Sequence, residues 1–121
     1  MAKILIVDDS PAEQYQLSNL LQKHGHHIMT ADNGADGVAL CCDEKPDIVL
    51  MDIMMPELNG FQATRQLSKN KDTQNIPVII ITTKDQETDR IWGIRQGAKS
   101  YLTKPVKEHL LIDALNDVLA A

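Results

Sequence analysis

The chain has 121 residues and a formal net charge of −5, and 43% of its residues are hydrophobic. This size and composition suit one domain with a hydrophobic core and exclude disorder, and the acidic balance argues against direct binding of DNA or RNA. The apolar runs are far shorter than the ~20 residues of a membrane helix. Met1-Ala2-Lys3 begins no signal peptide. We therefore expect a cytoplasmic protein without membrane insertion.

Short apolar runs alternate with amphipathic stretches along the whole chain. The predicted strands span residues 3–7, 27–31, 47–51, 77–81 and 100–102, and the helices after them span residues 11–24, 34–44, 60–69, 85–96 and 107–119. Strict alternation of strand and helix predicts a parallel sheet with helices on both faces. The expected fold is α/β, a flavodoxin-like three-layer sandwich with five parallel strands in the order 2-1-3-4-5.

Local signals mark where the helices begin and end. Ser10 is expected to cap the first helix, with Pro11 in its first position and Glu13 completing a capping box. Gly25 and Gly97 are expected to end the first and fourth helices. The last helix is expected to face the core through Leu110, Leu111, Ala114, Leu115 and Val118.

Charged and hydroxyl side chains follow four of the predicted strands. Asp8 and Asp9 follow the first, Asp52 the third, Thr82 the fourth and Lys104 the fifth. The carboxyl ends of parallel strands share one edge of the sheet, so these side chains are expected to lie together. Two carboxylates ~4 Å apart repel by roughly 4 kcal/mol at an effective dielectric constant of 20. The cluster therefore needs the lysine and a divalent cation, and its hard oxygen ligands favour Mg²⁺, with Mn²⁺ as a substitute.

This set of residues suits one kind of chemistry. A carboxylate can attack phosphorus and form an aspartyl phosphate. Phosphoryl transfer depends mainly on positioning and on neutralising charge. The cation, Thr82 and Lys104 would then each hold one phosphoryl oxygen.

Five motifs, in order along the chain, resemble the response-regulator receiver domain. They are Val7-Asp8-Asp9-Ser10, Leu50–Pro56, Asn59-Gly60, Ile81-Thr82-Thr83 and Tyr101-Leu102-Thr103-Lys104-Pro105. The resemblance covers essentially all of residues 1–121 and implies a single receiver domain with no output domain. The finer texture is similar to the stand-alone regulators of type IV pilus, or twitching-motility, chemosensory systems.

The resemblance implies a role for each acidic residue. Asp52 would be the phosphoacceptor, in a phosphorelay that begins at a histidine kinase. Asp9 and Asp52 would bind Mg²⁺ through their carboxylates, with the backbone carbonyl of Met54 as a third ligand. Asp8 would bind the ion through water.

The resemblance also implies how the signal is read. Thr82 would be the switch hydroxyl that moves toward the phosphoryl group, and Tyr101 would turn inward as it moves. Lys104 would hold another phosphoryl oxygen, and its peptide bond to Pro105 would be cis.

Two positions are implied to set the rate of self-dephosphorylation, and they carry Met54 and Lys84. Neither offers a carboxamide or carboxylate to orient a water molecule, so we expect a slow reaction and a phosphoacceptor that is not an enzyme. The implied partners are a CheA-type histidine kinase, or its phosphotransfer domain, and an output protein. The output protein would bind the face formed by residues 85–96, 100–102 and 107–119, and the domain would be a monomer.

Other functions fit less well. A haloacid-dehalogenase-type phosphatase needs a second aspartate two residues after the nucleophile, where this chain has Met54. A flavodoxin-like FMN carrier needs a phosphate-binding loop after the first strand, where Asp8 and Asp9 would repel the anion. A receiver-like module that binds partners without phosphorylation stays as an alternative. Signalling by protein contact and service as a phosphate sink both stay open.

Overall fold

Strands and helices alternate along the chain in the computed structural model, which describes residues 1–120. The strands are β1 (Lys3–Val7), β2 (His27–Ala31), β3 (Ile48–Met51), β4 (Val78–Thr82) and β5 (Ser100–Thr103), and the helices are α1 (Pro11–Lys23), α2 (Gly34–Glu44), α3 (Gly60–Lys69), α4 (Glu87–Arg95) and α5 (Glu108–Ala120). Every predicted element is present, with ends that differ by one or two residues at most.

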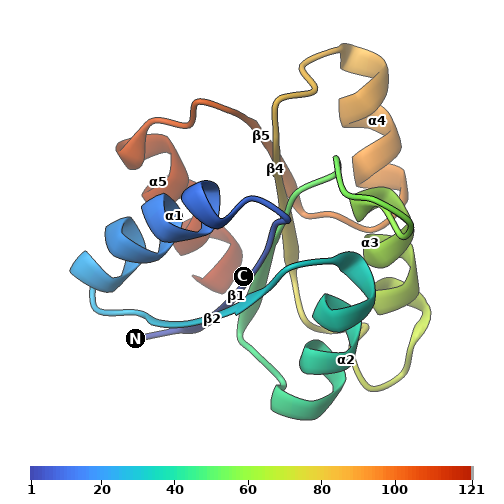
Figure 1. Ribbon diagram of the computed structural model, residues 1–121, viewed down its shortest axis with the longest axis horizontal. Coiled ribbons are helices and arrows are strands. Elements are labelled where there is room, and N and C mark those ends of the chain that lie inside the picture. Colours follow the sequence, from blue (N-terminus) through green and yellow to red (C-terminus); the bar gives the residue numbers. More distant parts are fainter. Residues whose placement is uncertain (121) are drawn as a thin grey trace.

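The strands form one parallel sheet in the order β2-β1-β3-β4-β5, which confirms the predicted fold class (Figure 1). Strands β3 and β4 lie inside the sheet, and all of their residues are buried. Strand β1 pairs with β3 so that Val7 lies opposite Met51, and β4 pairs with β5 so that Thr82 lies opposite Thr103. This register brings the ends of β1 and β3 together, and those of β4 and β5.

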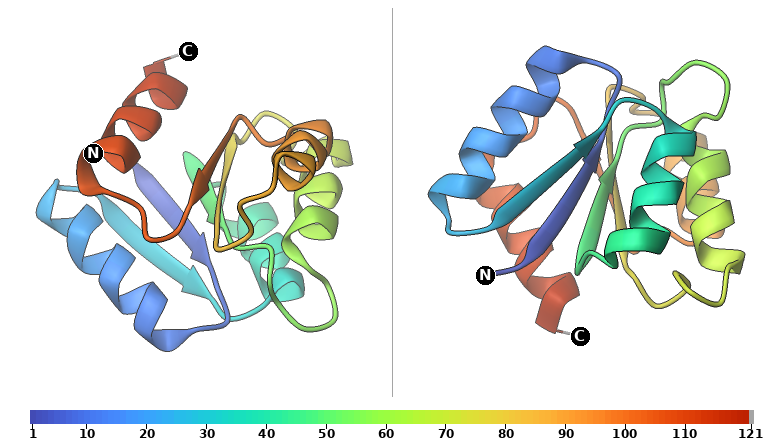
Figure 2. Two further views of the ribbon diagram at one scale, coloured as in Figure 1. Left: turned by 90° about the horizontal axis from the view of Figure 1, so that it is seen from above. Right: turned by 60° about the horizontal axis from the view of Figure 1, so that its bottom comes forward.

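Helices cover both faces of the sheet (Figure 2). Helices α1 and α5 lie on one face, where Ile4 and Ile6 of β1 pack with Leu21 and Leu111. Helices α2, α3 and α4 lie on the other face. There the alternate residues of β1 and β3 pack against α2 and α3 in a second cluster that contains Leu5, Val7, Cys41, Val49, Met51, Ala63 and Leu67. Side chains point alternately to the two faces of a strand, so each strand contributes to both cores.

Helix ends follow the predicted signals, with one correction. The Ser10 hydroxyl accepts a hydrogen bond from the backbone N–H of Glu13 at 3.3 Å, as expected of an N-cap. The reciprocal half of the predicted box is not formed, because the N–H of Ser10 donates to Oδ1 of Asp8 at 2.9 Å. Gly25 and Gly97 follow α1 and α4 with φ angles of 86° and 117°, which favour glycine.

The predicted inner face of α5 is mostly correct. Leu111 and Leu115 are fully buried, and Val118 is half-buried against the same core. Leu110 was predicted to face inward, but 48% of it is exposed. The face that packs on the sheet runs through positions four residues apart, and Leu110 lies beside that row.

No helix within residues 1–120 has both the length and the apolar character that crossing a bilayer requires.

Candidate functional site

Three carboxylates meet at the carboxyl edge of the sheet. Asp8 and Asp9 follow β1, and Asp52 follows β3, and carboxylate oxygens of all three lie within 4.8 Å of one another. Asp8 is 2% exposed and Asp52 is 8% exposed, whereas Asp9 faces solvent. Figure 1 shows the connections after these strands leaving the same edge of the sheet. The sequence-based prediction of an acidic cluster at this edge is therefore confirmed.

Backbone hydrogen bonds hold the two buried carboxylates in place. Oδ1 of Asp8 accepts from the N–H of Ser10 at 2.9 Å, and Oδ1 of Asp52 accepts from the N–H of Met54 at 3.3 Å. The side chain of Gln14 in α1 donates to the backbone carbonyl of Asp8 at 2.6 Å. These contacts orient the carboxylates without neutralising their charge.

Lys104, which follows β5, supplies positive charge to the cluster. Its Nζ lies 2.9 Å from Oδ2 of Asp8, 3.3 Å from Oδ2 of Asp52 and 3.6 Å from Oε2 of Glu13. Burial lowers the pKa of Lys104, but the hydrogen bond to Asp8 and the nearby carboxylate charges outweigh it, so the pKa is raised above 10.5. The stabilisation from this charge is complete below pH 10.5 and is lost only as the pH rises through the raised pKa.

The two threonines at the end of β4 differ in environment. Thr82 is the last residue of the strand, is fully buried, and its Oγ1 accepts from the N–H of Lys84 at 3.4 Å. Thr83 is exposed, and its hydroxyl donates to the sulfur of Met54 at 3.3 Å. Thr82 therefore has the strand-end position that the sequence predicted, and its role as the switch hydroxyl stays a prediction.

Tyr101 of β5 points into the protein. It is 5% exposed, packs in a cluster with Ile53, Ile80 and Ala98, and its hydroxyl donates to the backbone carbonyl of Lys84 at 2.8 Å. Burial, with smaller contributions from nearby aspartates, raises the pKa of Tyr101 to about 12. The hydroxyl thus connects β5 to the segment that follows Thr82.

The pKa of Tyr101 gives a direct test of this burial. In a Tyr15→Phe background, Tyr101 is the only tyrosine, and we expect its absorbance titration to have a midpoint near 12. Because the pKa of Tyr101 in the folded protein exceeds the ordinary 10.0, the contribution of the protonated hydroxyl to folding stability is complete below pH 10 and is lost as the pH rises toward 12. The double variant that also carries Tyr101→Phe is the blank, and a midpoint at 10 would contradict the buried position.

The remaining predicted residues lie around the cluster. The Lys104–Pro105 peptide bond is cis, as the family resemblance implies. Met54 is 54% exposed in the loop after β3, and Lys84 is exposed after β4. Sequence reasoning missed two contributors, Glu13 and Gln14, because both contacts depend on how α1 packs over the edge of the sheet.

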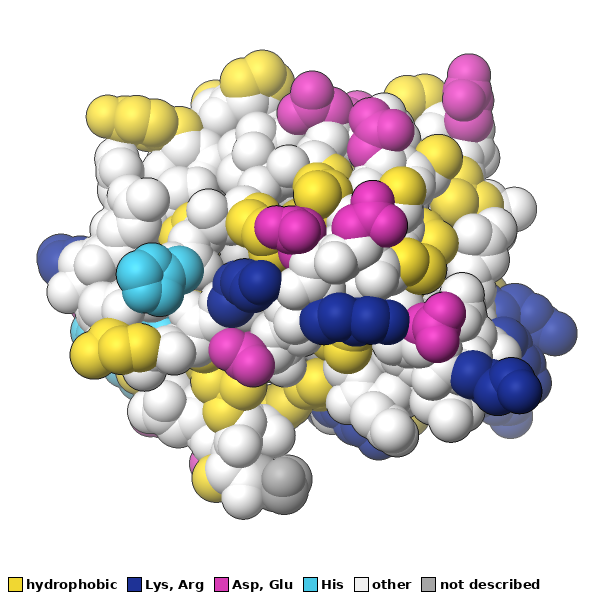
Figure 3. All heavy atoms as spheres, turned by 90° about the horizontal axis from the view of Figure 1, so that it is seen from below, with side chains coloured by type: hydrophobic (Ala, Val, Ile, Leu, Met, Phe, Trp, Pro, Cys, Tyr) yellow, Lys and Arg dark blue, Asp and Glu magenta, His cyan; other side chains and the backbone are white. Residues whose placement is uncertain are grey.

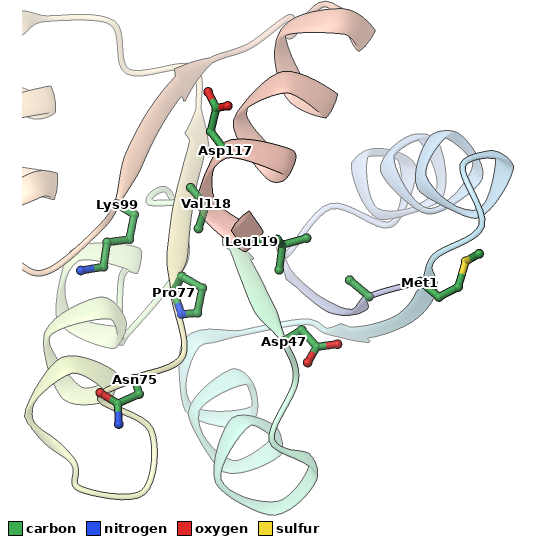
Figure 4. A pocket seen from close by; sticks show the side chains of 9 residues that line it. Met1, Asp47, Asn75, Pro77, Lys99, Asp117, Val118 and Leu119 are labelled. Atoms are coloured by element: carbon green, nitrogen blue, oxygen red, sulfur yellow. The ribbon is translucent and has the colours of Figure 1, made fainter. Parts of the chain in front are cut away.

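A hollow of about 820 Å³ lies at the opposite, amino-terminal edge of the sheet (Figure 4). Its charged residues are Asp47, Lys99 and Asp117, and their charged ends point apart in Figure 4. Figure 3 shows the face seen from below, where basic, acidic and hydrophobic side chains lie interspersed. Charged groups converge at the acidic cluster and Lys104 but not at this hollow, so the cluster is the candidate site.

The donor atoms of the cluster fit a hard divalent cation. All three side chains offer carboxylate oxygens, and two of them are buried beside a single lysine, which leaves an excess of negative charge. Five parallel strands in this order, with this cluster at their carboxyl edge, are the arrangement expected of a receiver-type signalling domain.

Comparison with known proteins gives the same class. The chain belongs to the response regulator receiver domain family, whose model matches residues 4–116. It is 67% identical over 120 residues to Protein PilH of Pseudomonas aeruginosa, covering 99% of both chains.

Two solved structures have the same fold over nearly their whole length. The chemotaxis protein CheY4 of Vibrio cholerae aligns with a TM-score of 0.91 at 29% identity, covering 98% of both chains. The receiver domain of the sensor histidine kinase PA1611 of P. aeruginosa aligns with a TM-score of 0.92 at 28% identity, covering 99% of this chain and 98% of that one. The PA1611 structure has a magnesium ion coordinated in its active-site cleft.

Proposed function

We propose that this receiver stores a signal as a phosphoryl group on Asp52. The single observation that carries the proposal is the carboxylate cluster beside Lys104, with Nζ 3.3 Å from Oδ2 of the acceptor. A buried carboxylate in this position can act as a nucleophile toward phosphorus. The ammonium beside it can then offset the negative charge of the aspartyl phosphate that forms.

Asp8, Asp9 and Asp52 are the proposed Mg²⁺ ligands, with Asp8 acting through water and the backbone carbonyl of Met54 as a further ligand. When bound, the ion supplies positive charge that offsets the carboxylates and the phosphoryl oxygens. The hard oxygen donors of the cluster support this choice of metal, and so does the magnesium ion of the PA1611 receiver domain.

The proposed reaction needs little from the protein beyond position and charge. A carboxylate oxygen of Asp52 attacks phosphorus, the bond from phosphorus to the donor nitrogen breaks, and the leaving imidazole takes a proton from solvent. Lys104 exchanges its contact with Asp52 for one with a phosphoryl oxygen, and the hydroxyl of Thr82 binds another. The protein is then an acceptor rather than an enzyme, and we propose that Met54 and Lys84 leave self-dephosphorylation slow.

The proposed donor is a CheA-type histidine kinase or its phosphotransfer domain, and the proposed output surface is the α4–β5–α5 face. We propose that Tyr101 responds to the movement of Thr82, because its hydroxyl already links β5 to the segment after Thr82. Control of type IV pilus, or twitching, motility is supported by the 67% identity with PilH along 99% of both chains. Output by protein contact and draining of phosphoryl groups from a shared kinase are both compatible with this role.

The test is uptake of one phosphoryl group. The protein is incubated with acetyl phosphate, with and without Mg²⁺, and its intact mass is measured. We expect one added phosphoryl group that requires Mg²⁺ and is absent from Asp52→Asn. The matched control is Asp43→Asn, which removes an exposed carboxylate of α2 and should be modified like the wild type. Modification of Asp52→Asn, or none of the wild type, would refute the proposal and favour a phosphorylation-independent binding module.

A further inference from the structure

Glu13 lies at the open side of the site. It is in the first turn of α1, and its Oε2 is 3.6 Å from Nζ of Lys104. Of the three carboxylates that contact this lysine, Glu13 is the accessible one, with 41% of its side chain exposed, compared with 2% for Asp8 and 10% for Asp52. Glu13 and Lys104 also line one hollow of about 320 Å³ between α1 and the segment after β5.

Lys104 makes two hydrogen bonds and one longer ion-pair contact. Its Nζ donates to Asp8 and Asp52, whereas Glu13, at 3.6 Å, lies beyond hydrogen-bond distance. A lysine ammonium has three N–H donors, and three carboxylates surround this one. A phosphoryl oxygen that binds Lys104 must compete with these carboxylates for the ammonium. The contact with Glu13 is the longest and the most exposed of the three, so it is the one that solvent and ligand reach first.

Glu13 stands apart from the metal-binding cluster. That cluster consists of Asp8, Asp9 and Asp52 and does not include Glu13. The carboxylate of Glu13 lines the hollow beside Lys104, so an anionic phosphodonor that approaches there meets a like charge. Like charges near a binding site slow the association of an anion, most strongly at low ionic strength.

We propose that Glu13 is a positioning residue that restrains phosphorylation of Asp52, because it holds the ammonium of Lys104 toward the mouth of the site and opposes the approach of anionic phosphodonors. This role rests on the proposed function, since it concerns the rate of the same reaction. Removing the charge weakens the attraction that holds the ammonium of Lys104 at the mouth of the site and removes the repulsion of the donor, and both changes accelerate phosphorylation.

The rate of phosphorylation by acetyl phosphate at saturating Mg²⁺ tests this role in Glu13→Gln. We expect about a three- to ten-fold increase over the wild type at low salt, as is typical of local charge effects on association. The difference should shrink as the salt concentration approaches ~1 M, where the screening length is ~3 Å. The matched control is Glu44→Gln, an exposed glutamate at the end of α2 that makes no side-chain contact with the site and should behave as the wild type.

A second readout needs neither donor nor metal. The pKa of Lys104, followed by ¹³C NMR of its ε-carbon, should be lower in Glu13→Gln, because the charge of Glu13 contributes to raising it, and unchanged in Glu44→Gln. Equal phosphorylation rates for Glu13→Gln and wild type at every salt concentration, with uptake still dependent on Asp52, would overturn this role alone. Absence of uptake by the wild type would overturn both this role and the proposed function.

Discussion

Replacing Lys104 with methionine should destabilise the metal-free protein by about 3 kcal/mol at neutral pH, as is typical when one partner of a buried ion pair is removed. The side chain of Lys104 is only 11% exposed, and its Nζ is within 3.3 Å of both Asp8 and Asp52. Methionine fills a similar volume, so the loss of stability comes from the two buried carboxylates that are left without a counter-charge. Urea unfolding followed by circular dichroism, with a chelator present, measures the change in the free energy of unfolding.

Two comparisons separate this charge effect from a general loss of packing. Mg²⁺ should restore much of the stability of Lys104→Met, because a bound cation replaces the missing positive charge. Lys23→Met removes a lysine whose Nζ lies 3.2 Å from Glu108 at an exposed site, and it should leave the free energy of unfolding nearly unchanged. Similar losses in the two variants, or no recovery with Mg²⁺, would contradict the role assigned to Lys104.

The fold could be predicted because its signals are local and repeat along the chain. Short apolar runs buried on both faces indicate a parallel sheet, and the amphipathic stretches between them supply the helical crossover connections that parallel strands require. The exact strand ends could not be predicted, because apolar character does not decide where backbone pairing stops. Strand β4 was predicted to end at Ile81, but pairing continues to Thr82 opposite Thr103. The prediction that Leu110 faces the core was wrong for a similar reason, since an apolar residue beside the buried row of a helix can remain exposed.

The site residues that directly follow a strand could be predicted from the sequence. Asp8, Asp9 and Asp52 had to meet because they follow neighbouring strands of a parallel sheet, and Lys104 joins them from β5. Glu13 could not be found in this way. Its local pattern indicated a bond to the N–H of Ser10, but the buried Asp8 takes that N–H, and Glu13 faces a lysine distant in the sequence. Tertiary contacts of this kind leave no periodic trace in a single sequence.

Gly60→Ala should lower the free energy of unfolding by about 3 kcal/mol, at the upper end of the losses that overpacking causes. An added Cβ at Gly60 would lie 2.7 Å from Cα of Ile53 and closer still to the carbonyl oxygen of Asp52. Both obstacles are backbone atoms, and the N–H of Gly60 also donates to the carbonyl of Ile53 at 3.0 Å. The strain can be relieved only by moving the loop after β3, so uptake of phosphoryl groups by Asp52 should fall as well.

Gly93→Ala is the matched comparison for this steric effect. A Cβ at Gly93 would meet the side-chain atoms Cδ1 of Ile80 at 2.8 Å and Cδ2 of Tyr101 at 3.0 Å. Side chains can shift where backbone cannot, and alanine in a helix interior is favoured over glycine by about 1 kcal/mol. Gly93→Ala should therefore lose much less stability in urea unfolding than Gly60→Ala. A loss for Gly60→Ala no larger than that for Gly93→Ala would show that the start of α3 does not constrain the loop carrying Asp52.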